Sequence, residues 1–295
     1  MLSLMRWLAR RPLRLLHTWG GWLGWAGYLL SPTYRRRLNA HAAMAGLECS
    51  TRRRAIVHAG RMVAEAPWLW LRPHGTTLGD KVQWHNAELI EQALAAGRGL
   101  LLLTPHLGCF EVCAQGYAER FGSHQPMTAL YRPARQAWLR ELETYARDRP
   151  GLRTAPASLA GVRQMLRALR KGETVGLLPD QVPPQGLGVW APFYGQPAYT
   201  MTLAARLVQQ SGAALLLMWG ERLPEGRGWR LHVRPAPALP TQADNEDALQ
   251  LACATAVNQA MERLIAECPE QYLWGYHRYK QPRGELHTTA EQGKP

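Results

Sequence analysis

A histidine and a glutamate lie five positions apart in the segment PHLGCFE, as His106 and Glu111. An imidazole has an ordinary pKa of about 6.5, so it can take a proton from a hydroxyl group near neutral pH. A carboxylate on the other ring nitrogen would fix the tautomer and stabilise the imidazolium that forms. The two residues are therefore a candidate general base and its orienting group.

The spacing permits contact between these side chains but does not prove it. On a regular helix, positions five apart differ by about 140° and face away from each other. If His106 instead lies in the turn before a helix, and Gly108 allows an irregular helix start, the carboxylate can reach the imidazole. The positive end of that helix would attract a developing oxyanion or a phosphate.

The elements around this segment alternate between strands and helices. The apolar run at residues 100–104 predicts a strand that Pro105 ends, which places His106 at the carboxyl end of a strand, where α/β sheets carry their sites. We expect strands at 81–84, 100–104, 127–131, 152–154, 174–178, 214–219 and 229–233, and helices at 86–96, 107–121, 134–149, 158–171, 199–211 and 243–267. This predicts an α/β fold with a mixed, largely parallel sheet flanked by helices. A hairpin turn at 222–228 would make one edge antiparallel.

The N-terminal region is basic and rich in tryptophan. Residues 1–61 contain eleven Arg, no Lys and one acid, so they carry +10 of the net charge of +13. An apolar stretch at 13–30 would form a helix about 27 Å long, close to the thickness of a bilayer. Arginines flank it on both sides, which suits an interfacial helix at least as well as a spanning one. A cleaved signal peptide and an ordinary buried helix remain weaker alternatives.

We therefore expect a helical membrane anchor over residues 1–30 and an α/β domain over 31–285, beginning with a helical lead-in at 31–72. A flexible tail would follow at 286–295. No nucleic-acid-binding motif is present, so membrane lipids are the expected anionic partner. The five cysteines are too few and too scattered for a disulfide scaffold or a familiar zinc site, and we expect no metal and no cofactor.

Several segments together resemble one protein family. His106 to Glu111 is similar to the H-x4-D/E motif of glycerolipid-type acyltransferases. PHLGCFE followed by ALYRP, GLLPDQ, APFYGQPAYT and PEQYLWGYHRYKQP resembles the late acyltransferases of lipid A biosynthesis, the lauroyl and myristoyl transferases. The resemblance extends over nearly the whole chain, to Pro282.

This resemblance implies acyl transfer from acyl carrier protein to a hydroxyl of a phosphorylated glycolipid, at the cytoplasmic face of the bacterial inner membrane. His106 would be the general base and Glu111 its partner. Arg132 would hold a substrate phosphate or help the oxyanion, and Asp180 and Gly108 would complete the substrate-binding residues.

Other interpretations remain open. His106 could cap a helix, Arg132 could pair with a surface acid, and Asp180 could cap the turn that follows it. At the level of function, the acceptor could be a lysophospholipid or another glycolipid. The chain could also be a lipid-binding protein of the membrane without catalytic activity, or a thioesterase.

Overall fold

The computed structural model describes residues 2–73, 75–131, 136, 142, 146, 149–282 and 284. Its centre is a seven-stranded sheet in the order β1-β9-β8-β2-β5-β3-β4. The strands are β1 (Val82–His85), β2 (Leu100–Leu103), β3 (Met127–Tyr131), β4 (Leu152–Pro156), β5 (Thr174–Leu177), β8 (Ala214–Arg222) and β9 (Trp229–Pro235). All seven strands expected from the sequence are present, with their ends shifted by a few residues.

Five neighbouring strands, β8, β2, β5, β3 and β4, run parallel. The β8–β9 pair is antiparallel, which confirms the expected hairpin, and β1 pairs in parallel with β9 beyond it. The expectation of a mixed, largely parallel sheet is therefore confirmed.

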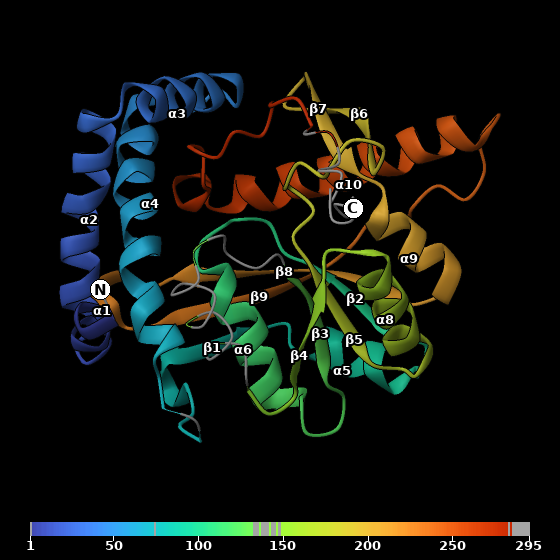
Figure 1. Ribbon diagram of the computed structural model, residues 1–295, viewed down its shortest axis with the longest axis horizontal. Coiled ribbons are helices and arrows are strands. Elements are labelled where there is room, and N and C mark those ends of the chain that lie inside the picture. The colour runs from blue at the N-terminus through green and yellow to red at the C-terminus, as the bar shows by residue number, and fades with distance from the viewer. Residues whose placement is uncertain are drawn as a thin grey trace, which may run out of the picture.

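Helices cover both faces of this sheet (Figure 1). Because successive side chains of a strand point to opposite faces, Leu101 and Leu103 of β2 join one apolar core and Leu100 and Leu102 the other. The first core also contains residues of α8 (Leu159–Arg170), α9 (Leu203–Ser211) and α10 (Glu246–Glu267). The second contains residues of α5 (Glu88–Ala95) and α6 (Phe110–Phe121).

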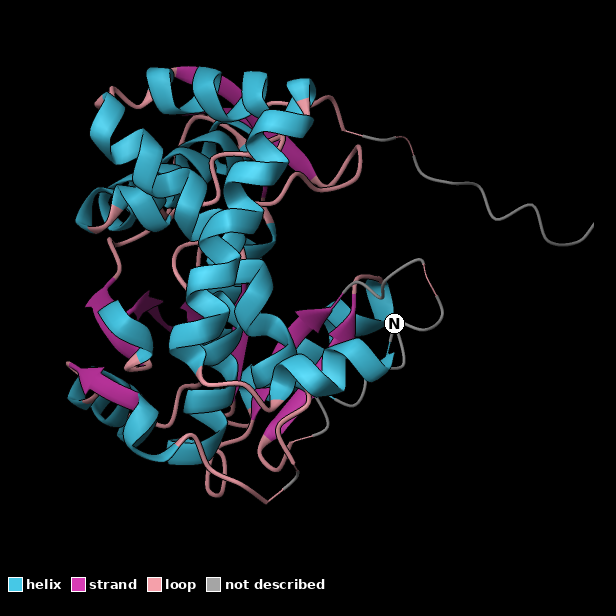
Figure 2. Cartoon of the chain, turned by 90° about the vertical axis from the view of Figure 1, so that its left-hand side faces the viewer, coloured by secondary structure: helices cyan, strands magenta, loops and turns pink. Residues whose placement is uncertain are grey.

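The N-terminal helices are α1 (Leu2–Ala9), α2 (Leu13–Leu30), α3 (Pro32–Met44) and α4 (Cys49–Trp70). Figure 1 shows α2 and α4 side by side, and in Figure 2 this helical pair lies in front of the sheet. A Cβ on Gly20, Gly24 or Gly60 would overlap the backbone of the partner helix, so glycine permits the close approach. Among the described residues, no helix is both long enough and apolar enough to cross a membrane.

A separate two-stranded ribbon was not expected from the sequence. Strands β6 (Gly188–Phe193) and β7 (Gln196–Met201) pair antiparallel with each other. The expected helix start at 199 is therefore wrong, and α9 begins at Leu203. The turn between the strands uses Tyr194 and Gly195, both with positive φ, as a two-residue hairpin requires. The helix expected at 134–149 lies largely outside the described residues.

Candidate active site

The ends of two neighbouring strands bring the polar side chains of the site together. His106 follows β2 and Asp180 follows β5, and each is reached through a proline, Pro105 or Pro179. Because β2 and β5 are hydrogen-bonded parallel neighbours, their carboxyl ends lie next to each other. Residues 74 positions apart in the chain thus become neighbours.

Asp180 holds His106 through two hydrogen bonds. Its Oδ1 lies 2.9 Å from Nδ1 of the imidazole, and its Oδ2 accepts the backbone N–H of His106 at 2.8 Å. Both residues are buried, with 7% of His106 and 1% of Asp180 exposed. A carboxylate on Nδ1 favours the tautomer with the proton on that nitrogen, which leaves the lone pair on Nε2. The imidazole is thereby oriented as a base.

Charge around the imidazole opposes the effect of burial. Burial by itself would lower the pKa of His106, but the charge of Asp180, the hydrogen bond to it and the charge of Glu111 together raise that pKa above its ordinary value. Burial would raise the pKa of Asp180, yet His106 lowers it. Asp180 is therefore ionised near neutral pH.

Glu111 lies half-buried in the first turn of α6. Its negative charge contributes to the raised pKa of His106, so the two side chains interact electrostatically. The hydrogen bond on Nδ1, which the sequence favoured for Glu111, is made by Asp180. The physical reason is that α6 begins only at Phe110, whereas Asp180 lies directly beside His106 at the end of the adjacent strand.

His106 lies in the turn before α6, as the irregular-start interpretation required. Gly108 has a φ of +60°, and a Cβ there would overlap the carbonyl oxygen of Gly220. Its N–H donates to the carbonyl of Gln271 at 2.9 Å, and the N–H of Cys109 donates to Gly220 at 2.8 Å. Gly108 thus allows the chain to turn against β8, and its own amide is already hydrogen-bonded.

A buried ion pair supports this turn from behind. Arg222 of β8 donates from Nη2 to the carbonyl of Gly108 at 3.2 Å and forms an ion pair with Glu65 of α4. Glu65 also accepts from the indole of Trp229 at 3.2 Å and lies 3.1 Å from Nε2 of His17 on α2. The N-terminal helices are therefore connected to the His106 turn by polar contacts.

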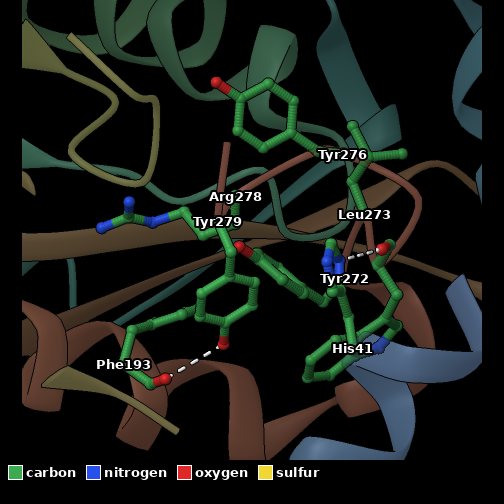
Figure 3. A pocket seen from close by; sticks show the side chains of 8 residues that line it. His41, Phe193, Tyr272, Leu273, Tyr276, Arg278 and Tyr279 are labelled. Atoms are coloured by element: carbon green, nitrogen blue, oxygen red, sulfur yellow. Dashed lines mark hydrogen bonds between the residues drawn. The ribbon is translucent and has the colours of Figure 1, made fainter. Parts of the chain in front are cut away.

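Mostly aromatic side chains line a small pocket that includes Tyr276 (Figure 3). Tyr276 lines it and stacks on His106, with ring centroids 5.9 Å apart and planes 8° apart. The N–H of Leu273 donates to the carbonyl of His106 at 3.0 Å, which fixes the C-terminal segment against the site. The other residues lining the pocket are His41, Phe193, Tyr272, Leu273, Trp274, Arg278 and Tyr279.

The two thiols near the site are poor nucleophiles. Cys109 and Cys113 are both buried, and burial raises the pKa of each well above its ordinary value. They pack in the core that contains α6, as expected of small buried thiols. Arg132, the expected phosphate-binding residue, lies outside the described residues.

Four contacts of the site were not expected from the sequence. They are Gln181 against Nε2 of His106, the Tyr276 ring on the imidazole, and the contacts of Arg222 and Gln271 with the His106 turn. Gln181, Gln271 and Tyr276 stand inside segments that carried the family resemblance, so the sequence held a signal for them. The contact of Arg222 becomes visible only once the position of β8 beside β2 is known.

Comparison with known proteins identifies the family. The sequence profile of the bacterial lipid A biosynthesis acyltransferases matches residues 53–281. The lipid A biosynthesis lauroyltransferase of Escherichia coli (strain K12) is 31% identical over 201 residues, which are 67% of this chain and 61% of that protein. The palmitoleoyltransferase of the same organism is 28% identical over 232 residues, 77% of this chain and 70% of that protein.

Another relative, matched over a shorter stretch, acts on a different lipid according to its name. The phosphatidylinositol mannoside acyltransferase of Mycobacterium tuberculosis (strain CDC 1551 / Oshkosh) is 29% identical over 153 residues, 50% of this chain and 46% of that protein.

The profile match covers most of the chain, and it includes His106, Glu111, Arg132 and Asp180. The chain therefore belongs to the bacterial lipid A biosynthesis acyltransferase family.

Proposed function

We propose that this protein transfers a fatty acyl group from an acyl carrier protein thioester to a hydroxyl group of a lipid A precursor. The observation that carries the proposal is the imidazole of His106, held by Asp180 on Nδ1 with Nε2 left as the basic nitrogen. The family of the chain supports the class of reaction and of acceptor.

In the proposed reaction His106 acts as a general base. Its Nε2 takes the proton of the acceptor hydroxyl as the hydroxyl oxygen attacks the thioester carbon. The carbonyl electron pair moves onto oxygen and returns when the carbon–sulfur bond breaks. The leaving thiolate takes the proton from the imidazolium, so the products are an ester and a thiol. Asp180 stabilises the imidazolium through the Nδ1–H, and Glu111 adds a second negative charge near the ring.

Two further roles are proposed by resemblance. Arg132 would bind a phosphate of the acceptor, because a guanidinium group matches phosphate geometry in a bidentate contact. A groove lined with apolar side chains would take the acyl chain, and its depth would set the preferred chain length. Transfer needs neither a metal nor a covalent acyl-enzyme in this mechanism.

The protein would work at the cytoplasmic face of the bacterial inner membrane. Residues of α1 and α2 support this, because large apolar side chains are exposed there beside arginines. Trp22 is 67% and Leu30 82% exposed, and the helices carry Arg6 and Arg14. Such a surface suits the boundary between anionic headgroups and acyl chains.

The proposal is tested with purified protein and acyl carrier protein charged with a fatty acid. A tetraacylated lipid A precursor should gain one acyl group, seen by mass spectrometry as an ester product. Lysophosphatidic acid and a mannosylated phosphatidylinositol serve as competing acceptors. Acylation of either of these, with the lipid A precursor left unchanged, would contradict the proposed acceptor.

The second candidate function is acylation of another membrane glycolipid. It is favoured by the similarity to a phosphatidylinositol mannoside acyltransferase over half of this chain. The two candidates share the same His106 chemistry and differ only in the acceptor. Mass spectrometry of lipid A from cells lacking the protein separates them, because only the first predicts the loss of one acyl group.

A further inference from the structure

A glutamine side chain covers the basic nitrogen of His106. Nε2 of Gln181 lies 3.2 Å from Nε2 of the imidazole. Because Nδ1 carries its proton toward Asp180, the other ring nitrogen is an acceptor, and the Gln181 amide donates to it. The acceptor hydroxyl must reach this same nitrogen in the proposed reaction, so Gln181 has to move aside first.

The position of Gln181 is held on both sides, although its side chain is exposed. The preceding residue, Asp180, is 1% exposed and bonds twice to His106. The following residue, Val182, donates its N–H to the hydroxyl of Tyr276 at 3.0 Å, and that ring stacks on His106. A fixed backbone with an exposed side chain allows the amide group to turn while staying close to the reacting atoms.

The backbone N–H groups of the turn that carries His106 are already hydrogen-bonded, so they are not open to an oxyanion. The N–H of His106 donates to Asp180, and that of Leu107 to Pro105. Those of Gly108 and Cys109 donate to Gln271 and Gly220. All four amides from residue 106 to residue 109 are thus used within the protein. An oxyanion formed next to Nε2 needs donors from other groups.

We propose that Gln181 is a further catalytic residue, whose amide covers the base at rest and donates to the thioester oxyanion once the acceptor hydroxyl has displaced it. This inference rests on the proposed function. The oxygen of the acceptor hydroxyl replaces the Gln181 amide at Nε2 of His106. The thioester carbonyl oxygen then takes up negative charge one atom beyond the attacked carbon, within reach of the displaced Gln181 N–H. No covalent bond to Gln181 forms or breaks. The amide returns to Nε2 of His106 after the thiol leaves.

The test compares Gln181→Ala and Gln181→Glu with the wild-type protein in acyl transfer to the lipid A precursor. The control is Gln185→Ala, which changes an exposed glutamine four residues further along the same loop. Loss of one oxyanion donor lowers kcat by about 10²–10³-fold, so both Gln181 variants should show this loss with little change in KM. The control should keep wild-type kcat.

The pH profile supplies a second readout that a merely structural role would not move. An N–H donated to Nε2 favours the neutral imidazole, so its removal should shift the acid limb of kcat/KM to higher pH. Gln181→Glu should shift it further, because a negative charge favours the imidazolium. Wild-type kcat and an unmoved limb in Gln181→Ala would overturn the inference, as would a change confined to KM.

The outcome is separable from failure of the proposed function. If the wild-type protein transfers no acyl group to any lipid, the proposed function fails. If the wild type is active, His106→Ala is inactive and Gln181→Ala behaves like the wild type, only the role of Gln181 is refuted.

Discussion

At the scale of single residues, the central feature is the division of roles between two carboxylates near one imidazole. Asp180 makes the hydrogen bonds to His106, while Glu111 contributes charge from the first turn of α6. In a base-and-orienter arrangement, the hydrogen-bonded carboxylate fixes the tautomer and a merely nearby charge does not. Loss of the Asp180 carboxylate should therefore lower the activity more than loss of the Glu111 carboxylate does.

The pH dependence of transfer should report the raised pKa of His106. The base must be neutral, so kcat/KM should rise with pH through an apparent pKa above the ordinary 6.5. Asp180→Asn removes the carboxylate and should lower that pKa, which moves the acid limb to lower pH. It should also lower kcat by about 10⁴-fold, because the asparagine amide favours the wrong tautomer.

Glu111→Gln is the variant to compare with Asp180→Asn, because each replaces a carboxylate near His106 by an amide. It should move the acid limb in the same direction by less than Asp180→Asn does, and it should retain more activity, because the hydrogen bonds of Asp180 remain. A larger loss in Glu111→Gln than in Asp180→Asn would contradict the assignment of Asp180 as the orienting carboxylate.

At the scale of elements, the sequence predicted the seven strands and the order of helices because their periodicity is strong and their ends carry Pro and Gly. It also predicted that His106 follows a strand. It could not pair His106 with Asp180, since that contact depends on β2 and β5 being neighbours. It missed the β6–β7 ribbon because Pro192, Gly195 and Pro197 indicate a loop.

A buried carboxylate of α4, that of Glu65, forms an ion pair with the buried guanidinium of Arg222 on β8. Burial would raise the pKa of Glu65, but Arg222 lowers it to about 2. Glu65→Gln would leave the guanidinium buried and unpaired, at a cost of about 3–5 kcal/mol of unfolding free energy. Urea unfolding followed by tryptophan fluorescence measures this, and Glu88→Gln on the exposed side of α5 is the control.

The contribution of the Glu65–Arg222 ion pair to the free energy of unfolding depends on pH. The folded-state pKa of Glu65 is lowered, so its contribution is complete above the ordinary value of 4.5 and is lost as pH falls through about 2. The gap in urea midpoint between the wild type and Glu65→Gln should therefore narrow over that window. A gap that is already absent at pH 7 would show that the ion pair does not stabilise the fold.

At the scale of the whole molecule, the distribution of charge and exposed apolar surface is uneven. Residues 1–61 carry most of the net positive charge, and several of the most exposed large apolar side chains belong to α1 and α2. The inner face of α2 packs on α4 through glycines, and its outer face carries Trp22 and Leu30. The sequence predicted a helical membrane anchor here, but which face of α2 is buried follows only from the position of α4.

Binding to lipid vesicles should depend on this outer face. The double variant Trp22→Ser/Leu30→Ser should sediment less with vesicles containing anionic lipid than the wild type does. Leu251→Ser, which changes an exposed leucine on α10, should bind like the wild type. Higher salt should weaken binding, because the arginines act through a screened surface potential. Equal sedimentation of the double variant and the wild type would show that lipid contacts another surface.

The most direct measurement is acyl transfer to a tetraacylated lipid A precursor by purified His106→Ala protein, under the conditions in which the wild type is active. If His106 is the base, kcat/KM falls by several orders of magnitude while the unfolding midpoint stays close to that of the wild type. Undiminished transfer by a folded His106→Ala variant would contradict the account, because the imidazole held by Asp180 would then take no part in the reaction.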